Sequence, residues 1–192
     1  YFELLKIYWP EHPNKIYLIT ETRGFCCDDL DIQVCNYPQT DTWSERLYKT
    51  LDQIRTKYIV FSLEDFFLLD YVKQDRIEEC VAWMENDPNI AVCRLYSSND
   101  ERLKPTQNYN DFYEADHSVG YRLDTQAALW NREALMSFID LTEDPWAFES
   151  KGTKRIENTE KKFLWHYSAD LYSLEGKIFP YRMLPNYGYG IA

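Results

Sequence analysis

The sequence has few of the residues that build common metal and nucleophile sites. Only three of its 192 residues are His, and its five Cys include no Cys-x-x-Cys pair. A structural zinc site takes about four Cys or His ligands, usually in closely spaced pairs, so zinc binding is not expected. The odd number of scattered Cys predicts reduced, buried thiols in a cytoplasmic protein.

Glycine and positive charge are also scarce. The six Gly form no Gly-x-Gly-x-x-Gly, P-loop or Gly-x-Ser-x-Gly motif. Lys and Arg number 21 against 32 Asp and Glu, which gives a net charge of −11 and argues against a nucleic-acid partner. No uncharged apolar run approaches the about 18 residues of a membrane-spanning helix, so no transmembrane segment is expected.

What the sequence does contain is a large apolar and aromatic fraction with alternating patterns. Hydrophobic residues make up 45% of it, which is ample for the core of one domain. Strands are expected where short apolar or alternating runs occur, at 15–20, 30–34, 58–61 and 90–95. Helices are expected where apolar residues recur at helical spacing, at 42–54, 73–84 and 125–139. The alternation predicts an α/β fold with a mainly parallel sheet.

Two carboxylates follow the most apolar of these runs. Residues 58–61 read Tyr-Ile-Val-Phe, and Glu64 and Asp65 come shortly after them. In open α/β sheets ligands bind beyond the carboxyl ends of strands, and Mg²⁺ or Mn²⁺ prefers carboxylate oxygens. The pair therefore predicts a metal site, while a turn-capping acid beside a solvated one explains the same residues equally well.

A third acid has an aromatic setting. Glu149 follows Trp146 and Phe148, and such surroundings can raise the pKa of a carboxyl so that it acts as a general base. The pattern alone favours the simpler interpretation, an exposed acid beside two core rings.

Several polar residues are weaker candidates. Arg46, in the first turn of a helix, either binds a ligand anion or pairs with Glu45 or Asp41, and the ion pair is slightly favoured. Gln126, in the first turn of the next expected helix, is a possible ligand contact. His166 is either a third metal ligand or, more in keeping with its aromatic neighbours, a core residue.

Four segments together resemble the GT-A nucleotide-sugar glycosyltransferases, most closely the bacterial enzymes found near capsule and surface-polysaccharide genes. These segments lie within residues 9–155 and comprise 42–47, 58–68, 121–130 and 146–149. The resemblance implies a Rossmann-like, mainly parallel sheet flanked by helices that binds a nucleoside diphosphate sugar. It implies that Asp65, with Glu64, holds Mn²⁺ or Mg²⁺ against the diphosphate, and that Glu149 deprotonates the acceptor hydroxyl in an inverting transfer.

The resemblance also implies a set of substrate contacts. Residues expected to line the donor and acceptor sites are Glu21, Thr22, Trp43, Arg46, Gln126 and Trp146. Residues 1–162 would form the catalytic domain, with its first strand before Tyr1, and residues 163–192 a small aromatic-rich C-terminal extension packed on it. The expected acceptor is a glycan or a lipid-linked saccharide, in the cytoplasm or at the inner face of the membrane.

Two other functions fit the same residues. One is a non-catalytic binding or assembly module on the same scaffold, because a fold does not determine its function. The other, weaker alternative is a hydrolase in which Asp65 and Glu149 act as an acid pair.

Overall fold

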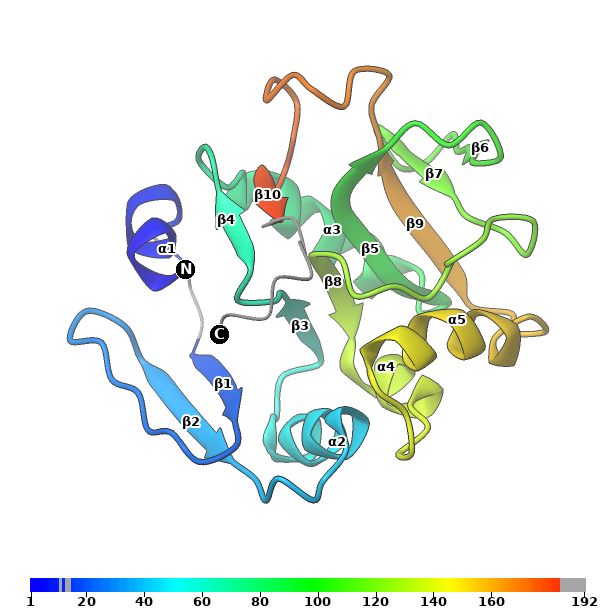
Figure 1. Cartoon of the computed structure of the whole chain (residues 1–192). Helices are drawn as coiled ribbons and strands as arrows, with labels where there is room; N and C mark the ends of the chain where they lie inside the picture. The colour runs from blue at the N-terminus through cyan, green and yellow to red at the C-terminus, as the bar shows by residue number, and fades with distance from the viewer. Residues whose placement is uncertain (11, 13–14, 184–192) are drawn as a thin grey trace, which may run out of the picture.

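The computed structural model describes residues 1–10, 12 and 15–183, which form a mixed α/β fold (Figure 1). Its helices are α1 (Phe2–Tyr8), α2 (Trp43–Gln53), α3 (Gln74–Asn86), α4 (Arg132–Phe138) and α5 (Pro145–Arg155). Its strands are β1 (Ile16–Thr20), β2 (Ile32–Asn36), β3 (Tyr58–Phe61), β4 (Phe66–Leu68), β5 (Ile90–Ser98), β6 (Lys104–Pro105), β7 (Phe112–Glu114), β8 (Ala128–Asn131), β9 (Lys162–Tyr167) and β10 (Tyr181–Met183). None of the helices in this described part of the chain is long and apolar enough to cross a membrane.

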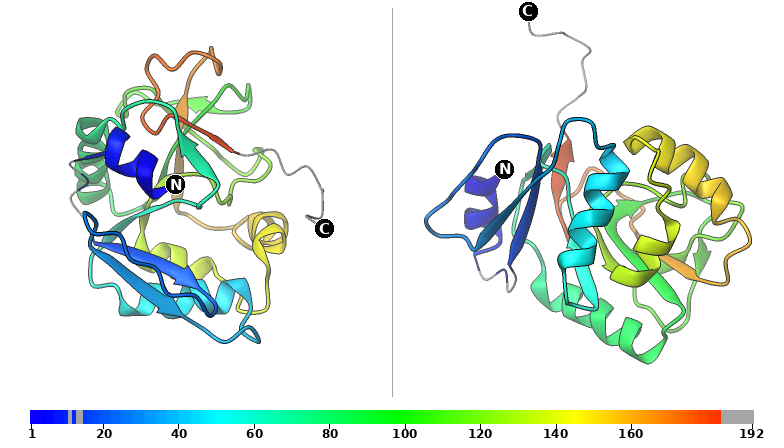
Figure 2. Two further views of the ribbon diagram at one scale, coloured as in Figure 1. Left: turned by 60° about the vertical axis from the view of Figure 1, so that its left-hand side comes forward. Right: turned by 90° about the horizontal axis from the view of Figure 1, so that it is seen from below.

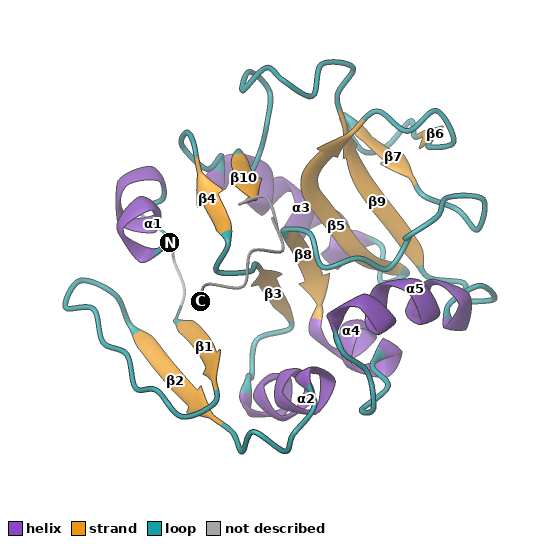
Figure 3. Cartoon of the chain, in the orientation of Figure 1, coloured by secondary structure: helices purple, strands orange, loops and turns teal. Residues whose placement is uncertain are grey.

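The central sheet corrects the expected fold class. It has six strands in the order β3-β8-β5-β9-β7-β6, and only the β5–β9 pairing is parallel (Figure 3). The expectation of a mainly parallel, GT-A-like sheet is therefore wrong. Apolar runs indicate that strands are buried but carry no information about their direction, and β8 enters between β3 and β5 antiparallel to both.

The strand β8 also replaces part of a predicted helix. The spacing over residues 125–139 predicted one helix, but the segment is β8 followed by α4. Asn131 marks the change, because its side chain accepts a hydrogen bond from the backbone N–H of Ala134 at 3.0 Å and so caps α4. The preceding Ala-Leu-Trp run is buried on both faces, where strand and helix cannot be told apart by periodicity.

The remaining strands form two small sheets of two strands each. β1 and β2 pair in parallel, and β4 pairs with β10 in antiparallel register, with Phe66 opposite Met183. β9 lies inside the central sheet between β5 and β7. The predicted division at residue 162 stays a prediction, and residues 184–192 of the predicted extension lie outside the described residues.

The core has two parts, one on each face of the central sheet. Adjacent residues of β5 point to opposite faces, so Cys93 belongs to one cluster with Phe66, and Val92 to the other with Phe163. The first cluster lies against α1 and α3, and the second against α2, α4 and α5. Figure 2 shows the same division, with α3 across the sheet from α2 and α4.

Candidate functional site

Two of the predicted site residues lie on chain segments that leave the central sheet at the same end, where β3 stops and β8 starts. Phe61, the last residue of β3, pairs with Ala128, the first residue of β8. The loop after β3 and the segment before β8 therefore leave the sheet at the same end, which we call the β3/β8 end. Asp65 lies on the first of these segments and Gln126 on the second.

Asp65 has a carboxylate oxygen without a partner. Its Oδ1 is buried and accepts no hydrogen bond from the protein, while its neighbour Glu64 is exposed. Burial, and then the negative charge of Glu64, raise the pKa of Asp65. A buried polar atom left unpaired is costly, so this oxygen is suited to a cation or a hydrogen-bond donor on a ligand.

These two acids have no third protein ligand beside them. Within residues 1–10, 12 and 15–183, no three His, Cys, Asp or Glu side chains are arranged to hold a metal ion. A hard cation such as Mg²⁺ is nevertheless often held by one or two carboxylates together with substrate phosphates. The buried oxygen of Asp65 fits that arrangement, in which the ligand completes the coordination.

Glu149 is held in place by the segment before β8. Asp144 caps α5 by accepting from the N–H of Ala147 at 2.7 Å, and Glu149 lies in the second turn. Its Oε1 accepts two hydrogen bonds from Thr125, from the backbone N–H at 2.8 Å and from the hydroxyl at 2.7 Å. The helix expected from residue 125 does not form here, and Thr125 orients this carboxylate instead. Both of these hydrogen bonds go to Oε1, and none from the described residues goes to the other oxygen, Oε2.

Gln126 is linked to the strand that follows Asp65. Its Oε1 accepts from the Tyr181 hydroxyl at 2.6 Å, and its Nε2 lies 3.8 Å from Met183 Sδ. Tyr181 in turn stacks on Phe66, with ring centroids 4.2 Å apart. Gln126 and the backbone that follows Asp65 thus share one support, strand β10.

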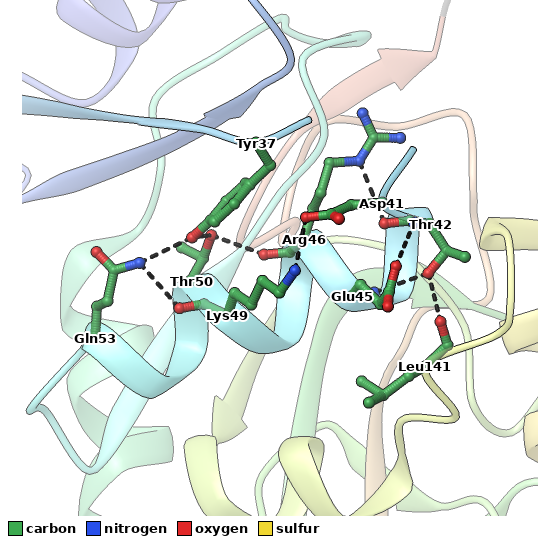
Figure 4. Close-up of polar contacts among 9 residues, drawn as sticks. All are labelled: Tyr37, Asp41, Thr42, Glu45, Arg46, Lys49, Thr50, Gln53 and Leu141. Carbon is green, nitrogen blue, oxygen red and sulfur yellow. Dashed lines mark hydrogen bonds and ion pairs between the residues drawn. The ribbon is translucent and has the colours of Figure 1, made fainter. Parts of the chain in front are cut away.

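Arg46 and Glu21 pair with each other at the start of α2. The Arg46 Nη1 and Glu21 Oε1 atoms are 2.6 Å apart. Neither expected partner is used, because Asp41 binds Lys49 and Glu45 completes the capping box with Thr42 (Figure 4). Arg46 therefore faces the end of β1.

The other predicted contacts lie around the first turns of α2 and α5. The Trp43 ring packs on Phe148 at 5.4 Å, so Trp43 acts mainly as a support for α5. Trp146, one turn before Glu149, is 70% exposed. Thr22 is exposed in the loop after β1. The structure brings Trp43 and Trp146 to the helix that carries Glu149.

The sequence interpretation missed an ion pair beneath this site. Arg94 Nε lies 2.7 Å from Asp124 Oδ2, and both side chains are 11% exposed. Burial raises the pKa of Asp124 to about 6, although Arg94 acts in the opposite direction. The available signal was the Arg within the apolar run of β5, because a charged residue in a buried strand needs a partner.

His166 is a core residue and does not join Glu64 and Asp65. It is 4% exposed on β9, and its Nδ1 shares a hydrogen bond of 2.9 Å with Ser97 Oγ. Burial lowers the pKa of His166 from 6.5 to about 4.

Acid is expected to destabilise the protein through His166. Between pH 6.5 and about 4 the unfolded state binds a proton that the folded state does not, so the free energy of unfolding falls as pH falls. The slope is at most about 1.4 kcal/mol per pH unit. Urea unfolding of the wild type and of His166→Gln, at neutral pH and in this acidic window, measures it. The variant should lose less stability on acidification, and equal losses would contradict a neutral His166.

Comparison with known proteins does not assign the chain to a family. No family model matches the sequence, and a search of the curated proteins found no match.

Proposed function

We propose that this protein transfers a sugar from a nucleoside diphosphate sugar to an acceptor hydroxyl. The observation that supports the proposal is that the segments leaving the sheet at the β3/β8 end carry Asp65 and hold Glu149, two carboxylates in different environments. Asp65 has a buried oxygen without a hydrogen-bond partner, and Glu149 has one oxygen held by Thr125 and the other without a hydrogen bond from the described residues. Cation binding and proton removal need these two environments.

Asp65, with Glu64 beside it, would hold Mn²⁺ or Mg²⁺ together with the phosphates of the donor. When bound, such an ion neutralises the charge that develops on the leaving nucleoside diphosphate. Gln126 would contact the donor from the same end of the sheet. Glu21 and Thr22, after β1, would contact the base or ribose, with Arg46 orienting Glu21 through their 2.6 Å ion pair.

Glu149 would act as the general base. Its Oε2 takes the proton of the acceptor hydroxyl while the acceptor oxygen bonds to the anomeric carbon. The bond from that carbon to the phosphate oxygen breaks, and its electron pair leaves with the nucleoside diphosphate. Attack opposite the leaving group inverts the anomeric carbon. The exposed ring of Trp146, one turn away, offers an apolar face for stacking the acceptor sugar.

Donor binding tests the role of Asp65. We expect Asp65→Asn to lower the affinity for UDP- or GDP-sugars in Mn²⁺ by about tenfold or more, because a charge-assisted contact is worth about 1.5–3 kcal/mol. Isothermal titration with a panel of donors, with and without Mn²⁺, measures this effect.

Asp70→Asn is the matched control. Asp70 is partly exposed, and its Oδ1 accepts a hydrogen bond from the backbone N–H of Tyr71 at 2.8 Å. Its substitution should leave donor affinity unchanged. Equal affinity in Asp65→Asn and wild type would remove the role of Asp65, and no binding of any donor to the wild type would remove the proposal.

A non-catalytic binding or assembly module is the second candidate. It is favoured by the lack of a third protein ligand near Asp65 in the described residues and by the engagement of Arg46 with Glu21. Such a module would bind a donor without consuming it. Release of nucleoside diphosphate in the presence of saccharide acceptors distinguishes the two functions.

The acceptor and location follow from the proposed reaction. The acceptor would be a glycan or a lipid-linked saccharide of a bacterial surface polysaccharide. The protein would act in the cytoplasm or at the inner face of the membrane, where nucleotide sugars are available.

A further inference from the structure

We propose that the Arg94–Asp124 ion pair is a positioning unit that sets Glu149 relative to Gln126. The inference deepens the proposed function, and it depends on that function only for its kinetic readout. Asp124, Thr125 and Gln126 are consecutive, and each makes a different long-range connection. The pair therefore acts on the reacting end of the site through three neighbouring residues.

Arg94 is fixed from the sheet side. It lies on β5 opposite Ala128 of β8 and opposite Trp165 of β9. Its guanidinium carbon lies 4.2 Å from the centroid of the Trp165 ring and 5.3 Å from that of Tyr96. The two rings and two strand pairings leave the guanidinium little freedom, so it offers Asp124 a defined anchor.

Asp124 links Arg94 to the turn that precedes β8. One of its oxygens, Oδ2, lies against Arg94, and the other, Oδ1, accepts from the backbone N–H of Gln126 at 3.2 Å. An aspartate that bonds two residues ahead closes a tight turn. Thr125 stands at its centre and therefore presents both its N–H and its hydroxyl to Glu149.

The same turn directs Gln126 to the opposite side. Its side chain accepts from Tyr181, whose hydroxyl is also 3.4 Å from the N–H of Ala127. Tyr181 is 4% exposed and stacks on Phe66, which follows Asp65. One turn thus connects the base on α5 with the strand that follows the proposed metal ligand.

A requirement for stability alone does not explain the pair. Removing two charges from water is costly, and an apolar pair of similar volume often stabilises a protein equally well. The negative charge of Glu149 also contributes, after burial, to the raised pKa of Asp124, so the two carboxylates repel each other. An arrangement of this kind is explained by the geometry that it imposes on Thr125 and Gln126.

The test compares Asp124→Asn, Arg94→Gln and the double variant by kinetics and by hydrogen exchange. Asn retains the acceptor for Gln126 but loses the ion pair, and the Asn–Gln pair of the double variant can form a hydrogen bond instead. We expect each single variant to lower kcat by about 100-fold, because small misplacements cost about that much, and to raise the donor KM, because Gln126 is displaced as well. The double variant should recover part of the loss.

Exchange of the Thr125 amide measures positioning without turnover. It should be at least tenfold faster in Asp124→Asn than in the wild type (about 1.4 kcal/mol of lost protection), because that amide donates to Glu149. If this variant does not fold, Arg94→Lys replaces it, since Lys keeps the charge but not the planar geometry. Unchanged exchange in the variant that folds would overturn the proposal.

Asp87→Asn is the matched control. Asp87 binds Lys162 at 2.7 Å near the opposite end of β5, so breaking that pair should leave Thr125 exchange and kcat unchanged. Equal effects in this control would overturn the proposal. A wild type without turnover would contradict the proposed function, and Thr125 exchange would then still decide the positioning role.

Discussion

Glu149→Gln is expected to lower kcat for sugar transfer by about 10²–10⁴-fold, the usual contribution of a general base. Gln retains a carbonyl oxygen that can accept the two hydrogen bonds from Thr125, so the fold and the donor site should persist. It cannot take a proton from the acceptor hydroxyl. Release of nucleoside diphosphate under saturating donor, with donor affinity from titration, measures the two effects separately.

The matched control lies beyond the other end of the same helix. Glu157 follows α5 and is exposed, so Glu157→Gln removes the same charge from the same region without touching the proposed site. Its kcat should equal that of the wild type. Retention of full activity in Glu149→Gln would exclude the base role, and transfer would then require another group.

Phe163→Ala is expected to lower the free energy of unfolding by about 3–5 kcal/mol, the usual range for a buried Phe. Phe163 is fully buried on β9, and its ring lies 6.2 Å from Trp130, 5.8 Å from Phe138 and 4.9 Å from the Arg122 guanidinium carbon. Truncation would leave a cavity where β8, β9 and α4 meet. Urea denaturation followed by circular dichroism measures the change.

Tyr172→Ala supplies the comparison on the same C-terminal segment. Tyr172 is 97% exposed, and loss of its ring should change stability by no more than about 0.5 kcal/mol. A Phe163→Ala protein as stable as Tyr172→Ala would mean that β9 is peripheral to the core. The large difference expected between them follows from the place of β9 inside the central sheet.

Local signals in the sequence predicted the elements that depend on local chemistry. Helix α2 was expected from its apolar spacing, and Thr42 with Glu45 forms a reciprocal capping box at its start. Strand β3 was expected from its apolar run. Both depend on residues within a few positions of one another, which a sequence displays directly.

The direction of each strand and its neighbours in the sheet were not predictable in the same way. The apolar residues of β8 matched a helical spacing by coincidence, and nothing in them specifies antiparallel pairing with both β3 and β5. Pairing depends on contacts between residues far apart in the chain. The expected parallel sheet is therefore wrong at β8, which lies between β3 and β5, and also at the antiparallel strands β6 and β7.

In the candidate site, too, the residues with local signals were predicted and those that depend on long-range contacts were not. Asp65 and Glu149 were identified by their residue type and flanking pattern, and their roles stay predictions. Their supports, Thr125 and Asp124, act through partners 24 and 30 positions away, Glu149 and Arg94. Contacts between residues so far apart produce no repeating pattern in the sequence. The sequence therefore indicated the proposed reacting side chains better than the residues that position them.

The exposure of Trp146 gives the site an optical label. Three of the other Trp residues, at positions 9, 130 and 165, are 8%, 2% and 5% exposed, whereas Trp146 is 70% exposed. A small aqueous quencher therefore reaches the indole of Trp146 more readily than those three buried rings. A saccharide that covers the first turn of α5 shields this indole, so intrinsic emission reports occupancy near Glu149 without an added dye.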